Sequence, residues 1–185
     1  MWINANLSQI NAKDTVVLAN NRQVLAFKKS YALQHKNTQL PKVLSWNQYL
    51  KNTWIALNSS AKNRFIDSVE SRYLIMQSLE ELGVKAQQQL LDEVVKNYDY
   101  CANHLIHLSE LSNTKLQFSE LFSTWINHYQ QYKAKLNLVD LNDLPSLIIN
   151  TKQKPRAPIV YGFKTLTPLQ QLVFDTIGHQ TLTAK

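Results

Sequence analysis

The chain has 185 residues, with 20 lysines and arginines against 13 aspartates and glutamates, a net charge of +7, 44% apolar residues and three glycines. So few glycines disfavour a hairpin-rich β architecture, because glycine supplies most of the positive-φ positions of tight turns. Gly83, Gly162 and Gly178 do not have the spacing of either glycine-rich phosphate loop, which excludes a Walker A or dinucleotide-binding loop.

The cysteine count and the apolar runs bear on the compartment. Cys101 has no partner for an intrachain disulfide, which fits a reducing cytoplasm. The first ten residues lack the basic and apolar regions of a signal peptide. The longest apolar clusters fall far short of the ~20 residues that a membrane helix needs. We therefore expect a soluble, cytoplasmic protein made of one domain or of a compact domain with an insertion.

The charge is unevenly distributed along the chain. Residues 1–64 carry nine basic side chains against one acidic, a net +8, and residues 144–185 carry five against one, a net +4. Residues 65–143 carry six against eleven, a net −5. Basic ends around an acidic middle suggest that the ends share a surface facing a polyanion, with nucleic acid as the first candidate. An ordinary solvated surface is the alternative.

The chain opens with a predicted strand–helix unit. Residues 15–19 form a continuous apolar and β-branched run, which indicates a buried strand. Asn20 and Asn21 follow, and either side chain can cap a helix over residues 22–33.

A second strand–helix unit follows Pro41. Residues 42–45 predict a short strand, and Ser45 can cap the helix after it. The apolar positions of that helix are Trp46, Tyr49, Leu50, Ile55 and Leu57.

From residue 62 to about 136 the apolar period is helical, and no strand is predicted. Apolar residues recur at steps of three and four along three runs. The runs are Phe65, Val69, Tyr73, Met76, Leu79; Leu91, Val94, Tyr98, Cys101, Leu105, Leu108; and Phe118, Leu121, Trp125, Tyr129, Tyr132, Leu136. We expect the last two runs to pair as an antiparallel hairpin joined near Ser112 and Asn113. Such a seam is typical of core packing rather than of a ligand site.

The chain then returns to alternating elements. Residues 140–150 predict a short helix, with Asp140 and Asp143 near its start as caps. A basic connector with two prolines, residues 151–158, leads to a predicted strand at 159–161.

The last predicted unit is a helix and the beginning of a strand. Thr167 can cap the helix, Pro168 suits its first position, and the helix runs over 169–177 to Gly178. Residues 181–184 could start one more strand. The chain stops there without a polar tail, so we expect the native polypeptide to continue.

No metal or acid–base site is expected. Cys101, His104 and His107 are spaced by three residues, and successive threes on a helix rotate the side chains away from a single ion. The adjacent acidic pairs at 80–81 and 92–93 diverge on their helices and suit a solvated face.

The order of elements predicts an α/β fold in which a parallel sheet is interrupted by a helical insertion. The expected parts are residues 1–61, the insertion at 62–150, and the return to the α/β domain at 151–185. Helices dominate the chain overall.

Three segments resemble a known family. DTVVLANNRQVLAFKKSYA resembles the first strand–helix unit of AddB-type helicase–nuclease subunits, and of a related bacterial group of DNA repair proteins regarded as inactivated superfamily I helicases. PKVLSWNQYLKNTW is similar to their next segment. YGFKTLTPLQQLVFDTI resembles the segment of the second nucleotide-binding motif, where Asp-Gly-Phe, Thr-Pro and a Glu are expected. The resemblance covers most of the chain and implies a RecA-like, P-loop-NTPase-like sheet that lacks the P-loop.

The chain departs from an active motor of that family at two positions. Tyr161 stands where the magnesium-binding aspartate is expected, and Gln170 where the glutamate after Thr-Pro is expected. Phosphoryl transfer needs Mg²⁺ held by carboxylate and a loop around the phosphates, because its catalysis is mostly charge stabilisation. We therefore expect this segment to be a motor-shaped domain without ATPase activity, catalytic residues or a cofactor.

The resemblance places single-stranded DNA at the first strand–helix loop, which here holds Asn20, Asn21 and Arg22. Helix N-terminal amides, amide side chains and a guanidinium suit a phosphate, and Lys28 and Lys29 lie farther along the helix. Simple capping by asparagine with an exposed arginine is the alternative.

Trp46 and Tyr49, beside Lys51, could stack bases. The other interpretation is that both aromatic residues belong to the core of an amphipathic helix.

Two functional hypotheses follow. The first is an N-terminal helicase-like module of a DNA repair or recombination nuclease, which binds or positions DNA, with an active helicase–nuclease subunit as a further partner. In the AddB-type relatives a PD-(D/E)xK-type nuclease lies in the C-terminal region, so the whole polypeptide could be an exonuclease. The second is a protein-interaction scaffold that docks a partner on the acidic helical hairpin. Only the first requires a steep dependence on salt.

Overall fold

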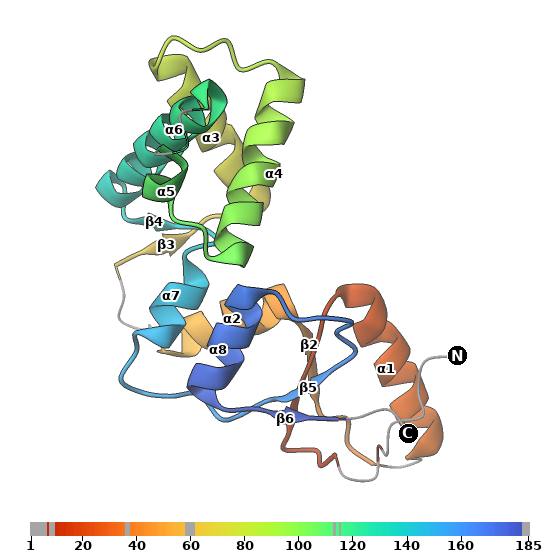
Figure 1. Cartoon of the computed structure of the whole chain (residues 1–185). Helices are drawn as coiled ribbons and strands as arrows, with labels where there is room; N and C mark the ends of the chain where they lie inside the picture. The colour runs from red at the N-terminus through yellow and green to blue at the C-terminus, as the bar shows by residue number, and fades with distance from the viewer. Residues whose placement is uncertain are drawn as a thin grey trace. The chain divides into compact units, whose positions relative to one another are not determined.

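The computed structural model describes residues 7, 10–35, 38–57, 62–112, 114 and 116–182 (Figure 1). The chain forms two compact units. We call Met1–Ser59 with Ser146–Leu166 and Gln171–Lys185 the α/β unit, and Ser60–Pro145 with Thr167–Gln170 the helical unit. The predicted divisions after residues 61 and 150 lie two and five residues from the boundaries at 59 and 145.

The α/β unit holds a four-stranded sheet in the order β2-β1-β5-β6, and every neighbouring pair is parallel. The strands are β1 (Thr15–Leu18), β2 (Lys42–Ser45), β5 (Ile159–Tyr161) and β6 (Gln180–Thr181). The parallel sheet and the strands predicted at 15–19, 42–45 and 159–161 are thus confirmed. The strand expected at 181–184 is β6, which begins one residue earlier, and residues 183–185 lie outside the described part.

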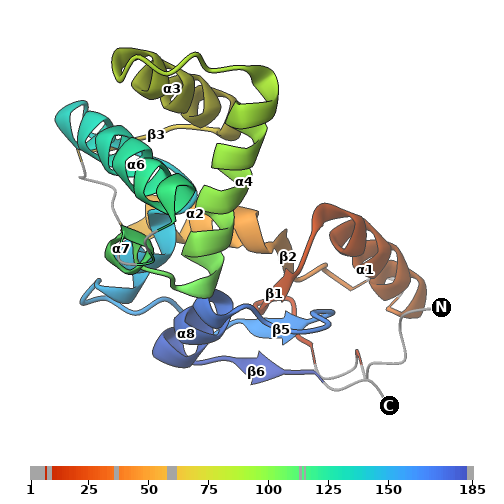
Figure 2. The ribbon, with the colours of Figure 1, turned by 45° about the horizontal axis from the view of Figure 1, so that its top comes forward.

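Helices cover both faces of this sheet. The helices are α1 (Asn21–Gln34), α2 (Trp46–Leu57) and most of α7 (Leu144–Ile149) and α8 (Pro168–Ile177). Alternation along β1 turns Val16 toward Phe27 of α1 and sends the buried Val17 to the opposite face. On that face α2 and α8 lie together, with the Trp46 and Phe174 ring centroids 5.2 Å apart (Figure 1, Figure 2).

The predicted helix boundaries of this part rest on capping contacts. Asn20 precedes α1, and its Oδ1 accepts the N–H of Gln23 at 3.0 Å. At α8, Gln170 N donates to Thr167 Oγ1 at 3.3 Å, and Thr167 N donates to Gln170 Oε1 at 3.0 Å, which is a capping box. Gly178 follows α8 with φ 77°, a conformation that suits a helix C-terminus.

The helical unit contains four helices and a short parallel ladder among its described residues. The helices are α3 (Ser68–Glu81), α4 (Gln88–His104), α5 (Leu108–Ser112) and α6 (Gln117–Lys135), and the ladder joins β3 (Arg64–Phe65) to β4 (Leu138–Val139). The prediction that no strand lies between 62 and 136 is therefore wrong. A two-residue strand has no visible alternation, and its identity depends on a partner far away in the sequence.

Part of the predicted apolar faces is exposed. The first run was counted from Phe65, but that residue lies in β3, and α3 begins at Ser68, capped by the Asp67–Glu70 capping box. The predicted core positions that are exposed are Val69, Tyr73, Leu105, Phe118, Leu121 and Leu136. The buried predicted positions are Leu79, Leu91, Val94, Tyr98, Cys101, Trp125 and Tyr129, and the core adds Ile75, Phe122 and Ile126.

The predicted hairpin of residues 91–108 with 118–136 is also wrong. Leu105 has φ 56° and ends α4, and α5 then forms a separate helix. The helices packed most closely on α6 are α3 and α5. Helix α4 reaches α6 through side chains, as where the Tyr98 and Tyr129 rings meet edge to face at 5.8 Å.

The helical unit encloses a charged cluster that the sequence does not predict. Lys133 of α6 is 3% exposed, and its Nζ lies 2.7 Å from Asp140 Oδ2 and 2.6 Å from Asp143 Oδ2. The Tyr129 hydroxyl donates to Asp140 Oδ2 at 2.8 Å. Asp140 Oδ1 accepts the N–H groups of Asn142 and Asp143, which holds the turn before α7. The two aspartates expected as caps therefore also neutralise a buried cation.

Among the helices of the described residues, none combines the length and the apolar character needed to cross a bilayer. In the same residues no three His, Cys, Asp or Glu side chains are arranged to hold a metal ion. Cys101 is buried in the helical core, and the His104 ring stacks on Tyr100.

Candidate nucleic-acid interface

The sheet reverses its order of growth between β1 and β5. From β1 the chain moves outward to β2 on one side, and after the helical residues it returns to add β5 on the other side. In open α/β sheets, ligands bind outside the carboxyl ends of the strands at such a switch point, because the flanking loops diverge there and leave a crevice. A ligand site is therefore expected at the carboxyl ends of β1 and β5.

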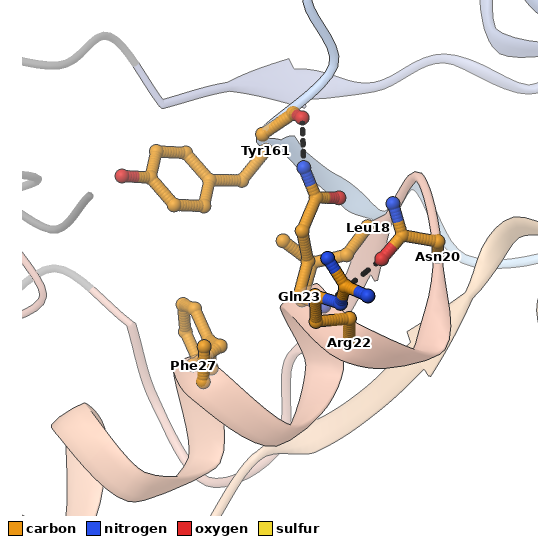
Figure 3. A pocket seen from close by; sticks show the side chains of 8 residues that line it. Leu18, Asn20, Arg22, Gln23, Phe27 and Tyr161 are labelled. Atoms are coloured by element: carbon orange, nitrogen blue, oxygen red, sulfur yellow. Dashed lines mark hydrogen bonds between the residues drawn. The ribbon is translucent and has the colours of Figure 1, made fainter. Parts of the chain in front are cut away.

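A pocket of about 380 Å³ lies at this switch point (Figure 3). Its apolar wall includes Leu18 at the end of β1, Phe27 of α1 and Tyr161 at the end of β5. The two rings meet edge to face with centroids 6.2 Å apart. The polar side chains that line the pocket, Asn20, Arg22 and Gln23, come from the β1–α1 loop and the first turn of α1.

Gln23 joins the carboxyl ends of the two strands. Its Oε1 accepts the N–H of Ala19 at 3.0 Å, and its Nε2 donates to the carbonyl of Gly162 at 2.7 Å. Figure 3 shows this side chain between α1 and the end of β5, with the Phe27 and Tyr161 rings to one side. The sequence does not predict this role of Gln23, since no local signal pairs it with a residue 139 positions away.

Gly162 permits this close approach. Its φ is 74°, and a Cβ built there would lie 3.2 Å from Leu18 Cδ2 and 3.5 Å from the Gln23 amide. A larger residue would therefore be strained in its backbone and would press on the bridge.

The N-terminus of α1 is open to solvent beside the pocket. Asn20, Asn21 and Arg22 are exposed, and the first turn contains no acidic residue. In the part of the chain that the structure describes, the Arg22 guanidinium forms no hydrogen bond or ion pair. Asn20, Asn21 and Arg22 thus share one helix start, where a positive charge and the positive end of the helix dipole attract an anion, although Asn20 already caps the Gln23 N–H.

The two lysines of the predicted set are exposed but do not face the same way. Arg22 and Lys29 are seven residues apart and share one side of α1, whereas Lys28 is rotated by about 100° from Lys29. An extended polyanion that follows α1 would meet Arg22 and Lys29 together and Lys28 at its flank.

Trp46 does not belong to this surface. It is 6% exposed and packs against Tyr49 and Phe174, so its ring is not available to a base. Burial of the apolar face of α2 against α8 decides this placement. The core interpretation of Trp46 and Tyr49 is the correct one.

Tyr161 and Gln170, which the sequence predicts to be degenerate nucleotide-site positions, both make contacts within the fold. Burial raises the pKa of Tyr161, so its phenol is neutral at physiological pH and does not replace a carboxylate. Gln170 is engaged in the capping box of α8 through both its backbone N–H and its side chain.

The charge asymmetry of the sequence persists between the two folded units. The α/β unit carries twelve lysines and arginines against two aspartates, a net +10, and the helical unit carries eight against eleven, a net −3. The positive charge therefore belongs to the unit that holds the switch-point pocket.

Comparison of the sequence with models of protein families and with characterised proteins finds no match.

Proposed function

We propose that this chain is an ATPase-inactive, helicase-like module that binds or positions single-stranded DNA for a repair or recombination nuclease. The observation that carries the proposal is Arg22, which has no ion pair among the described residues and lies at the exposed N-terminus of α1, beside the switch-point pocket of a unit with a net charge of +10. A helix N-terminus and a guanidinium both attract phosphate, and the surrounding charge raises the rate of encounter.

A RecA-like layout is part of the same proposal. The all-parallel sheet with helices on both faces is compatible with it. The proposed module contributes no catalysis, and any nuclease activity would lie in the remainder of a longer polypeptide or in a partner subunit. We place it in the cytoplasm, where such partners and DNA are found.

The test of DNA binding is the triple variant Arg22→Glu, Lys28→Glu, Lys29→Glu of the full chain. We expect it to lose most of its affinity for a single-stranded oligonucleotide, and the slope of log affinity against log salt to fall in magnitude by about 2, since each lost phosphate contact removes about 0.7. Fluorescence anisotropy across a salt series measures both quantities.

The matched control makes the same charge change on the helical unit. Lys62→Glu, Lys85→Glu, Lys96→Glu replaces three exposed lysines, and its affinity should stay close to that of the parent. Equal losses in the two triple variants would mean that net charge, and not the α1 surface, attracts the DNA.

Absence of ATP binding is the second test. Tyr161 and Gln170 supply no charge for Mg²⁺, and the sequence has no glycine-rich loop for the phosphates. Calorimetric titration of the protein with Mg-ATP should therefore show no heat of binding. A micromolar dissociation constant would contradict the proposed inactive motor.

The scaffold alternative has one observation in its favour. Val69 and Tyr73 lie one turn apart on α3 and are 73% and 54% exposed, which suits a docking partner. A partner bound there would show little salt dependence, whereas the DNA proposal requires a steep one.

A further inference from the structure

A second pocket of the α/β unit, of about 320 Å³, lies at the opposite end of the strands from the switch point. Thr15 and Lys42, the first residues of β1 and β2, form one side of it. Tyr49 and Asn52 of α2 form another, and the basic connector at 153–156 completes the wall. The pocket belongs to neither the α1 surface nor the helical unit.

The lining of this pocket is cationic and contains no carboxylate. Arg156 is held by Asp14 at 3.0 Å and by the carbonyl of Lys13 at 3.1 Å, so its charge is largely neutralised while the connector is fixed in place. Lys154 Nζ donates to the carbonyl of Ile149, a neutral acceptor, at 3.0 Å. The Lys42 ammonium has no hydrogen bond or ion pair among the described residues. Lys42 and Lys154 therefore line the pocket without an ion pair among the described residues.

Neutral donors accompany these cations. Tyr49 is 4% exposed, and its hydroxyl is enclosed without a hydrogen-bond partner of good geometry among the described residues. Burial raises the pKa of Tyr49 to about 12, and the nearby Thr53 hydroxyl counters part of that rise, so the phenol keeps its proton. Thr15 and Asn52 add a hydroxyl and an amide to the lining. An enclosed donor that lacks a partner, here the Tyr49 hydroxyl, favours an acceptor-rich ligand.

We propose that this pocket binds a phosphate group, held by the Lys42 and Lys154 ammonium groups and by hydroxyl and amide donors from β1 and α2. A phosphate has several acceptor oxygens and a negative charge, which match this lining, whereas an apolar ligand would leave the cations desolvated. The group belongs either to a nucleic-acid backbone or to a small phosphate ester. This site is independent of Arg22 and goes beyond the proposed function.

Titration of the full, isotope-labelled chain with inorganic phosphate tests the site. At constant ionic strength set by chloride, we expect the amide NMR signals of Lys42, Asn52 and Lys154 to shift and those of the α1 N-terminus to stay in place. Lys42→Gln and Lys154→Gln should each weaken phosphate binding about tenfold, because each removes one charge-assisted hydrogen bond. Tyr49→Phe, which keeps the ring packing, should weaken it several-fold.

Lys152→Gln is the matched control, since Lys152 is exposed on the same connector and does not line the pocket. Unchanged phosphate affinity in the Lys42→Gln, Lys154→Gln double variant, an equal loss in Lys152→Gln, or a response that chloride reproduces would overturn the proposal.

Oligonucleotide binding by the double variant distinguishes the two sources of phosphate. A parallel loss of single-stranded DNA affinity would assign the site to the nucleic-acid backbone. Unchanged DNA affinity together with lost phosphate binding would assign it to a small phosphate ester. Both results support the phosphate site, and neither depends on the outcome of the α1 triple variant.

Discussion

Replacement of Lys133 by methionine is expected to lower the free energy of unfolding of the helical unit by about 3–5 kcal/mol, since removing one partner of a buried ion pair leaves uncompensated charge. Lys133 is the cation for two carboxylates, Asp140 and Asp143, at 2.7 and 2.6 Å. Methionine fills a volume similar to that of lysine, so the loss of unfolding free energy measures the removal of the charge and not the creation of a cavity. Urea denaturation followed by far-UV circular dichroism measures it.

The loss should depend on pH in a defined direction. Burial and the Asp140 charge raise the pKa of Asp143, and the Lys133 ammonium offsets part of the rise. An acid whose folded pKa is raised contributes stability below its unfolded pKa and loses it as the pH rises through the folded pKa. Without Lys133 the folded pKa rises further. The deficit of the variant should therefore be largest at neutral pH and should narrow in mild acid.

Two further variants control this experiment. Lys135→Met makes the same change at an exposed position of α6 and should alter the unfolding free energy by less than about 1 kcal/mol. Adding Asp143→Asn to Lys133→Met removes one of the orphaned charges and should recover part of the loss. A deficit that is independent of pH and unaffected by Asp143→Asn would show that the ion cluster is not its cause.

Gln23→Glu is expected to destabilise the α/β unit by about 1–3 kcal/mol, because it leaves a partly buried carbonyl without its donor. The glutamate can still accept from the Ala19 N–H, but at neutral pH it places a carboxylate oxygen against the Gly162 carbonyl, where Nε2 now donates at 2.7 Å. The side-chain link between the β1–α1 loop and Gly162 at the switch-point pocket is lost, so single-stranded DNA affinity should fall as well.

Acid provides the internal check for Gln23→Glu. Repulsion from the Gly162 carbonyl raises the folded pKa of the introduced carboxyl, and the protonated form regains a donor. Stability relative to the parent should therefore recover as the pH falls through that pKa and disappear as it rises. Gln34→Glu, an exposed change on the same helix, should cost less than about 1 kcal/mol and show no such recovery. A flat pH response in Gln23→Glu would argue against the bridge.

Local signals explain which parts of the fold the sequence predicted. The apolar run at 15–19 and the Asn20 cap fall within a few consecutive residues, and they mark β1 and the start of α1 correctly. Thr167, Pro168 and Gly178 mark both ends of α8 for the same reason. Each signal acts through contacts within four residues, so one stretch of sequence contains all the information.

The buried faces of the helices and the elements that pack on them were predicted less well, because both depend on distant segments. Val69 and Phe118 fit a helical period, yet they are exposed, since the packing of α3, α5 and α6 selects a neighbouring face. Trp46 was a candidate for base stacking until the position of Phe174 made it a core residue. The apolar period of a helix indicates that it has an apolar side, but not which other helix covers that side.

The candidate site shows the same division. Its charged residues, Arg22, Lys28 and Lys29, were chosen from the sequence, and all three are exposed on α1. The pocket beside them, the Gln23 bridge and the second pocket with Lys42 and Lys154 were not, because each joins residues more than a hundred positions apart.

The sequence by itself determined the alternation of strands and helices, the caps, the lack of a glycine-rich phosphate loop and the uneven charge, since all of these are properties of short segments or of composition. Only the tertiary structure decided the strand order β2-β1-β5-β6, the pairing of β3 with β4, and the buried Lys133, Asp140 and Asp143 cluster. The physical reason is that strand pairing and the burial of charge gain free energy only when distant segments meet, so no local pattern records them.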